Sequence, residues 1–193
     1  MPSTSNVFYD VAQGAWYYDA VQYVTQSGLM TGGSDKQFAP NTILSRAQVV
    51  QILYALARGD WYADAVSWAT ANGVVSGMGK GMFGPNAPLT REQLALILYH
   101  YAQVAEYVPH QGSMAVQKFS DSASISGWAL EAVQWAVNAG LISGTGGGML
   151  DPDGTATRAQ VAQIFMNFCQ DNAIELVFPK MAPYRFGQCG AIS

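Results

Sequence analysis

The chain has 193 residues, of which half are hydrophobic and 12% are aromatic, so it carries enough apolar side chains for a substantial core in one or two domains. Its net charge of −4 at pH 7 does not favour nonspecific attraction to nucleic acid or to an anionic membrane surface. No stretch approaches the roughly 18 uninterrupted apolar residues of a membrane-spanning helix, and residues 1–6 lack the features of a signal peptide, so we expect any export signal to lie upstream or to have been removed.

The sequence contains a threefold internal repeat that begins at Trp16, Trp61 and Trp128. In every copy an Ala-Val pair follows the tryptophan after a short gap, and glycines and a proline recur at fixed positions further on. In all three copies an arginine follows the tryptophan at the same distance, with no insertion or deletion between them; these are Arg46, Arg91 and Arg158. A unit of this size cannot bury its apolar face without its neighbours, so the copies should fold as one body. The copies start 45 and 67 residues apart, which favours a compact bundle over a long solenoid.

The repeat predicts five segments along the chain. They are repeat 1 (1–57), repeat 2 (58–102), a linker (103–115), repeat 3 (116–170) and a tail of open role (171–193). Repeat 2 has a shortened lead, because Ala57-Arg58-Gly59-Asp60 runs directly into its tryptophan.

Each copy shows the pattern of a helix, a loop and a second helix. In copy 1, residues 16–27 have helical spacing, and Gly28 follows where a helix cap needs a left-handed residue. Residues 29–44 predict a loop, with Phe38 as a plug into the core. A hydroxyl residue then begins the second helix, and a glutamine stands three positions later as in a capping box. These pairs are Ser45 and Gln48, Thr90 and Gln93, and Thr157 and Gln160.

The repeated arginine allows two interpretations. It occupies the first helical position, where the helix dipole makes a cation unfavourable by roughly 0.3 to 1 kcal/mol. Each arginine could pair with a carboxylate, such as Asp10, Asp121 or Asp64, and so orient one copy against the next. Alternatively, the guanidinium and free backbone N–H groups at the helix start could hold a carboxylate or phosphate, with glycines such as Gly32, Gly77 and Gly144 letting the ligand approach the backbone.

The chain resembles the S-layer homology domain family over about residues 7–170. In copy 1 the resemblance is carried by Phe8-Tyr9-Asp10-Val11, Trp16, Gly28-Leu29, Gly32, Phe38, Pro40 and Ser45-Arg46-Ala47-Gln48. It implies a mainly α fold of three helix-loop-helix repeats, packed as a pseudo-threefold bundle in which the first helices form a central three-helix core.

The resemblance also implies a noncatalytic, extracellular module that attaches a protein to the bacterial cell wall. Grooves between adjacent repeats would bind a secondary cell wall polysaccharide, anionic through ketal-linked pyruvate, whose carboxylate meets the motif arginine. The implied ligand-binding residues are Arg46, Arg91, Arg158, Ser45, Thr90, Thr157, Gln48, Gln93, Gln160, Gly32, Gly77, Gly144, Asp10 and Asp121. The alternative is a structural or protein-binding module, with self-association as one form of it.

Two departures from the family pattern bear on the grooves. Copy 2 lacks the Phe-x-Asp-Val lead, so one groove is expected to be altered. Copy 3 has Phe119-Ser120-Asp121-Ser122 as its lead and Leu150 where the other copies have an aromatic residue, which is a milder change.

No catalytic, cofactor or metal site is predicted. His100 and His110 have no nucleophile or metal-ligand pattern around them, and the glycine-rich residues 144–148 lack the strand and the Lys-Ser/Thr ending of a phosphate loop. The two cysteines, Cys169 and Cys189, could form one bridge or remain two free thiols.

Overall fold

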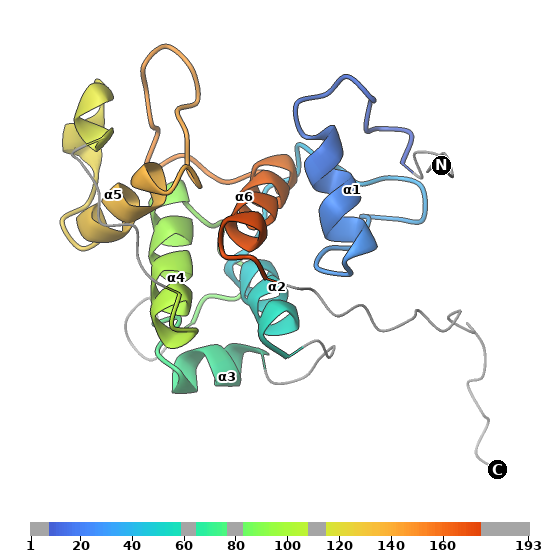
Figure 1. Ribbon diagram of the computed structural model, residues 1–193, viewed down its shortest axis with the longest axis horizontal. Helices are drawn as coiled ribbons and strands as arrows, with labels where there is room; N and C mark the ends of the chain where they lie inside the picture. Colours follow the sequence, from blue (N-terminus) through green and yellow to red (C-terminus); the bar gives the residue numbers. More distant parts are fainter. Residues whose placement is uncertain (1–7, 59–64, 77–82, 108–114, 175–193) are drawn as a thin grey trace.

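The computed structural model describes residues 8–58, 65–76, 83–107 and 115–174. Figure 1 shows the arrangement of their helices. The α-helices are α1 (Tyr18–Gln26), α2 (Arg46–Arg58), α3 (Ala65–Ala71), α4 (Arg91–Val104), α5 (Leu130–Asn138) and α6 (Arg158–Asp171), with 3-10 helices η1 (Ala115–Lys118) and η2 (Ser122–Ser124). The predicted mainly α fold is therefore confirmed. Trp61, Asp64, Gly77, His110, Cys189 and residues 175–193 of the tail lie outside the described residues.

The second helices begin where the capping boxes predicted. Thr90 and Thr157 are the N-caps of α4 and α6, and each exchanges hydrogen bonds with the glutamine three residues later. Ser45 makes the same pair of bonds with Gln48 before α2. The first helices start slightly later than expected, since α1 begins two residues after Trp16.

The helices pack in cyclic order between copies. α1 packs against α6, α3 against α2, and α5 against α4, so each first helix lies on the second helix of the preceding copy and copy 1 lies on copy 3. In Figure 1 the second helices lie in the middle, with α1, α3 and α5 around them. The expectation that the first helices form the central core is therefore wrong. The physical reason is length, because the first helices have 7 to 9 residues whereas the second have 13 or 14, and within each copy the second helix buries more apolar side chains than the first.

A closed ring of backbone hydrogen bonds joins the three copies just before the second helices. Leu44 N–H donates to the Ala156 carbonyl (3.2 Å), Ala156 N–H donates to that of Leu89 (3.0 Å), and Leu89 N–H donates to that of Leu44 (3.1 Å). All three residues are buried in the apolar core. A buried peptide group without a partner costs about 1–3 kcal/mol, so each copy depends on the other two.

The loop between the helices of a copy is anchored by its aromatic plug and by an acidic residue from the lead. Phe38 is fully buried and packs against the Phe8 ring, as expected for the plug. The Asp10 carboxylate accepts hydrogen bonds from the N–H groups of Phe38 (2.8 Å) and Ala39 (2.7 Å). Ala39 has a left-handed backbone with φ of 59°, so these bonds hold a strained turn.

Cys169 on α6 is a free, buried cysteine. Its thiol contacts the Tyr23 hydroxyl of α1, and burial raises the pKa of the thiol to about 11. The side chain is therefore a protonated part of the packing between copies 1 and 3.

No helix in the described part of the chain combines the length and apolar character that crossing a membrane requires.

The loop geometry predicts a strong effect of Gly32→Ala. A Cβ at Gly32 would meet the carbonyl oxygens of Ser34 at 2.4 Å and Gln37 at 2.8 Å, and the Phe8 ring at 2.6 Å. We expect the variant to lose about 1–3 kcal/mol of unfolding free energy, measured by urea denaturation. Gly14→Ala is the matched control, because nothing lies within 4 Å of a Cβ there. Equal unfolding midpoints for the two variants would contradict this account of the loop.

Candidate functional site

The three repeated arginines connect neighbouring copies through backbone carbonyl groups. In each case Nε donates to one carbonyl of the next copy in the cycle, and Nη2 donates to a second. The acceptors are Phe83 and Ser76 for Arg46, Leu150 and Ser143 for Arg91, and Phe38 and Thr31 for Arg158. In the described part of the chain these acceptors are backbone carbonyls, whereas the sequence suggested carboxylates such as Asp10 and Asp121; Asp64 lies outside the described residues. The contacts join one copy to the next, as that interpretation expected.

The environment of the guanidinium groups is largely apolar. Arg46 and Arg91 are buried, and the guanidinium carbons of Arg46 and Arg158 lie 5.1 Å and 4.5 Å from the ring centres of Phe83 and Phe38. Burial lowers the pKa of all three side chains, and for Arg91 the charges of Asp151 and Asp121 oppose this shift. An arginine nevertheless remains charged, so each of these junctions holds a fixed positive charge, and the hydrogen bonds given above use two of its five N–H donors on described residues.

The backbone N–H groups at the helix starts are not free, which corrects one expectation from the sequence. The N–H groups of the first two residues of each second helix donate to carbonyl groups of the next copy. The pairs are Arg46 and Ala87, Ala47 and Pro85, Arg91 and Gly154, Glu92 and Pro152, Arg158 and Thr42, and Ala159 and Pro40. The third N–H is taken by the capping hydroxyl. An anion would therefore have to be held by side chains and not by these helix starts.

Asp10 and Asp121 have equivalent roles in copies 1 and 3. The Asp121 carboxylate accepts the N–H groups of Leu150 (2.8 Å) and Asp151 (2.7 Å), as Asp10 does in its own loop. These bonds, with that of Leu150 first, lower the pKa of Asp121 despite some desolvation, and the charge of Arg91 adds to the effect. Leu150 also accepts a hydrogen bond from Arg91 at its carbonyl. The carboxylate therefore holds the N–H of this residue and the guanidinium holds its carbonyl. In copy 2 the stretch before the repeat is the end of α2, which leaves no such lead.

Gly32 and Gly144 have a packing role. A Cβ at Gly144 would meet the Met149 carbonyl at 2.8 Å and the Phe119 ring at 2.9 Å, which parallels the contacts at Gly32. The close approach at these glycines is thus to the protein's own loop and lead.

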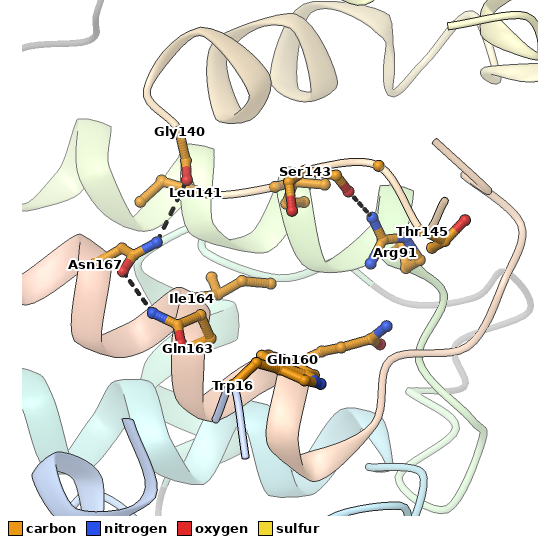
Figure 2. A pocket seen from close by; sticks show the side chains of 12 residues that line it. Trp16, Arg91, Gly140, Leu141, Ser143, Thr145, Gln160, Gln163, Ile164 and Asn167 are labelled. Atoms are coloured by element: carbon orange, nitrogen blue, oxygen red, sulfur yellow. Dashed lines mark hydrogen bonds between the residues drawn. The ribbon is translucent and has the colours of Figure 1, made fainter. Parts of the chain in front are cut away.

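A pocket of about 450 Å³ lies where all three copies meet. Trp16 comes from copy 1, Arg91 from the start of α4 in copy 2, and the rest from copy 3. The copy 3 residues are Gly140, Leu141, Ile142, Ser143, Gly144, Thr145, Gln160, Gln163, Ile164 and Asn167. Figure 2 shows the side chains of α6 facing the segment 140–145 across the pocket, with Arg91 at its far end.

Two amide side chains on α6 form a short hydrogen-bonded chain along the pocket. Gln163 Nε2 donates to Asn167 Oδ1 (2.9 Å), and Asn167 Nδ2 donates to the Gly140 carbonyl (3.4 Å) (Figure 2). Trp16 is 63% exposed although it belongs to the repeat motif, so its ring is available to a ligand. The pocket therefore combines an aromatic ring, amides and one buried cation.

The pocket brings together only part of the site predicted from the sequence. Arg91, Gly144 and Gln160 line it. The other described candidates lie elsewhere, at the equivalent positions of the cycle or in the caps and loops; they are Arg46, Arg158, Ser45, Thr90, Thr157, Gln48, Gln93, Gly32, Asp10 and Asp121. The motif does not point to Gln163 or Asn167, because neither position is the same in all three copies: copy 2 has Leu96 at the first, and the other copies have Ala55 and His100 at the second.

Glu92 is a further polar residue whose role the sequence does not reveal. Its carboxylate is buried and accepts the backbone N–H (3.0 Å) and the hydroxyl (2.9 Å) of Ser126, two residues before Trp128. These hydrogen bonds therefore hold the segment just before Trp128, where copy 3 begins, against α4. Within the described ranges, no three histidine, cysteine or acidic side chains come together in a way that could hold a metal ion.

Comparison with known proteins gives a family and one relative. The family described as the S-layer homology domain matches the chain three times, over residues 7–50, 57–95 and 118–162. A stretch of 46 residues is 44% identical to the Surface-layer 125 kDa protein of Lysinibacillus sphaericus, and it covers 24% of this chain and 4% of that protein. The chain thus matches only a small part of the length of this relative.

The carbonyl contacts predict that charge is not sufficient at position 91. Arg91→Lys keeps the positive charge but loses the planar fork that reaches the carbonyls of both Leu150 and Ser143. We expect a loss of about 1–3 kcal/mol in unfolding free energy, because at least one buried carbonyl is left without its donor. Thermal and urea unfolding measure this, and wild-type stability of the lysine variant would refute the structural role.

The lowered pKa of Asp121 predicts a pH-dependent contribution to stability. A carboxyl whose pKa is depressed by folding stabilises the protein above its unfolded value near 3.9, and this contribution is lost as the pH falls through the folded value. Asp121→Asn should therefore be less stable than the wild type at pH 6, and the difference should shrink below about pH 4. Urea unfolding at both pH values provides the measurement; a difference independent of pH would contradict the assignment.

Proposed function

Since this chain belongs to the S-layer homology domain family, a family of noncatalytic cell-surface anchoring modules, we propose that it attaches a protein to the bacterial cell wall by binding a secondary wall polysaccharide. We propose further that the polysaccharide is anionic, carries pyruvate, and binds in the grooves between copies. The larger protein to which the module belongs would then be held outside the cell.

The observation that carries this proposal is the pocket at the junction of the three copies. Its volume of about 450 Å³ suits a sugar residue or two, and it is lined by polar and apolar groups side by side. Sugars present both kinds of surface, because their hydroxyl groups lie around the edge of a ring with apolar C–H faces. The exposed ring of Trp16 can cover such a face, and the amides of α6 can bond the hydroxyls.

Arg91 accounts for the preference for an anionic ligand. Its Nε and Nη2 each donate one hydrogen bond to a carbonyl, so within the described residues three N–H donors remain for a ligand carboxylate. Arg91 itself is buried, which strengthens a charge-assisted hydrogen bond to its guanidinium. Because the chain is acidic overall, attraction to an anionic polymer must come from such local positive charges.

Calorimetric titration of the whole chain with pyruvylated wall-polysaccharide fragments tests the proposal. We expect saturable binding that is lost when the same fragments have been stripped of pyruvate, because the carboxylate is the partner of the arginine. Substituting all three arginines is a weaker test, since they also hold the loops of adjacent copies together.

Trp16→Ala supplies the matched variant for that titration. Its side chain is exposed, so the fold should persist, while the affinity for pyruvylated fragments should fall about tenfold, or about 1.4 kcal/mol. Tyr9→Ala removes an exposed aromatic ring that does not line the pocket and serves as the control. If the wild type binds no fragment and instead self-associates or captures a protein, the structural or protein-binding alternative replaces this proposal.

A further inference from the structure

Each lining residue of the pocket that lies on α6 has a counterpart at the same position of α2 and of α4. Gln160 and Ile164 have the same residue types at their counterparts in the other two copies. Gln163 is shared with copy 1, which has Gln51 at this position, but not with copy 2, which has Leu96. Asn167 is found in copy 3 alone, since its counterparts are Ala55 and His100. The three copies therefore share their arginine and their capping glutamine but differ along the second helix.

We propose that Gln163 and Asn167 are specificity-determining residues that bind a pair of neighbouring sugar hydroxyls. The pocket beside α6 is consequently the principal saccharide site of the chain. This inference rests on the proposed function and concerns which groove works and which residues select the sugar.

The hydrogen bonds along α6 prepare the two amides for this task. Gln163 Nε2 donates to Asn167 Oδ1 and Asn167 Nδ2 donates to the Gly140 carbonyl, so both amide planes are oriented by the protein. Each amide nitrogen keeps a second N–H, and Gln163 Oε1 has no donor within the described part of the chain. A donor and an acceptor side by side match two adjacent hydroxyl groups, each of which can donate and accept.

The remaining wall of the pocket complements the amides. Trp16 and Arg91 lie on the same pocket, so a sugar ring against Trp16 could place its carboxylate at Arg91 and its hydroxyls at α6. Fixed donors and acceptors cost little ordering entropy on binding, which favours a pre-organised site.

The equivalent amide in copy 1 is not available in the same way. Gln51 Nε2 is buried and has no hydrogen-bond partner within the described residues, and Ala55, one turn later, offers no acceptor where Asn167 stands in copy 3. In copy 2 Leu96 packs against the core and provides no polar group at all. Neither α2 nor α4 therefore carries the paired amides of α6.

Titration with monovalent pyruvylated fragments of one polymer repeat tests the inference. The wild-type chain should show one strong site. Asn167→Ala, which introduces the residue of copy 1, and Gln163→Leu, which introduces that of copy 2, should each weaken binding about tenfold. The controls Gln51→Leu and His100→Ala should stay within about twofold of the wild type, and unfolding curves of all four variants establish that they fold.

A gain-of-function variant makes the test independent of any loss of stability. Ala55→Asn places an acceptor four residues after Gln51, as in the Gln163–Asn167 pair, and should add a second site to the titration. Two or three equal sites in the wild type, or folded Asn167→Ala and Gln163→Leu variants that bind as the wild type does, would overturn the inference while leaving the proposed function standing. A wild-type chain that binds no fragment would overturn both.

Discussion

Three buried backbone hydrogen bonds among Leu44, Leu89 and Ala156 form the constraint on which the rest of the molecule depends. They close a ring, so removing any copy leaves buried peptide groups without partners in the other two. The first N–H groups of each second helix and the arginine side chains extend the same cyclic pairing outward. The groove residues of three copies meet at the α6 pocket because this network holds their backbones in fixed positions.

Much of the local structure could be predicted from the sequence, because it depends on short-range chemistry. The capping boxes at Thr90 and Thr157 and the buried plug Phe38 follow from residue type and spacing. The partners of Arg91 could not be predicted, since backbone carbonyls carry no sequence signal and the acceptors lie in another copy. For the same reason the motif predicted free N–H groups at the start of each second helix, whereas these groups donate to carbonyls of the next copy.

The roles of the site residues divide along similar lines. Residues shared by all copies, such as the arginine, maintain the junctions, and they add a positive charge to each groove. Residues that vary between copies, such as Asn167, cannot be recognised from the repeat, yet they line the pocket. The residues that a threefold repeat makes recognisable are therefore those that join the copies. The side chains by which one copy differs from another are not recognisable from the repeat.

Ring closure also determines when native contacts can form during synthesis. The partner of α1 is α6, at the opposite end of the described chain, so α1 finds its partner last, although α2 of the same copy can already pack against α3. Contacts between distant segments form late because the loop between them must first be closed at an entropic cost. A nascent chain ending after its second copy would still have α1 unpaired, which keeps the growing polypeptide open until α6 has been made.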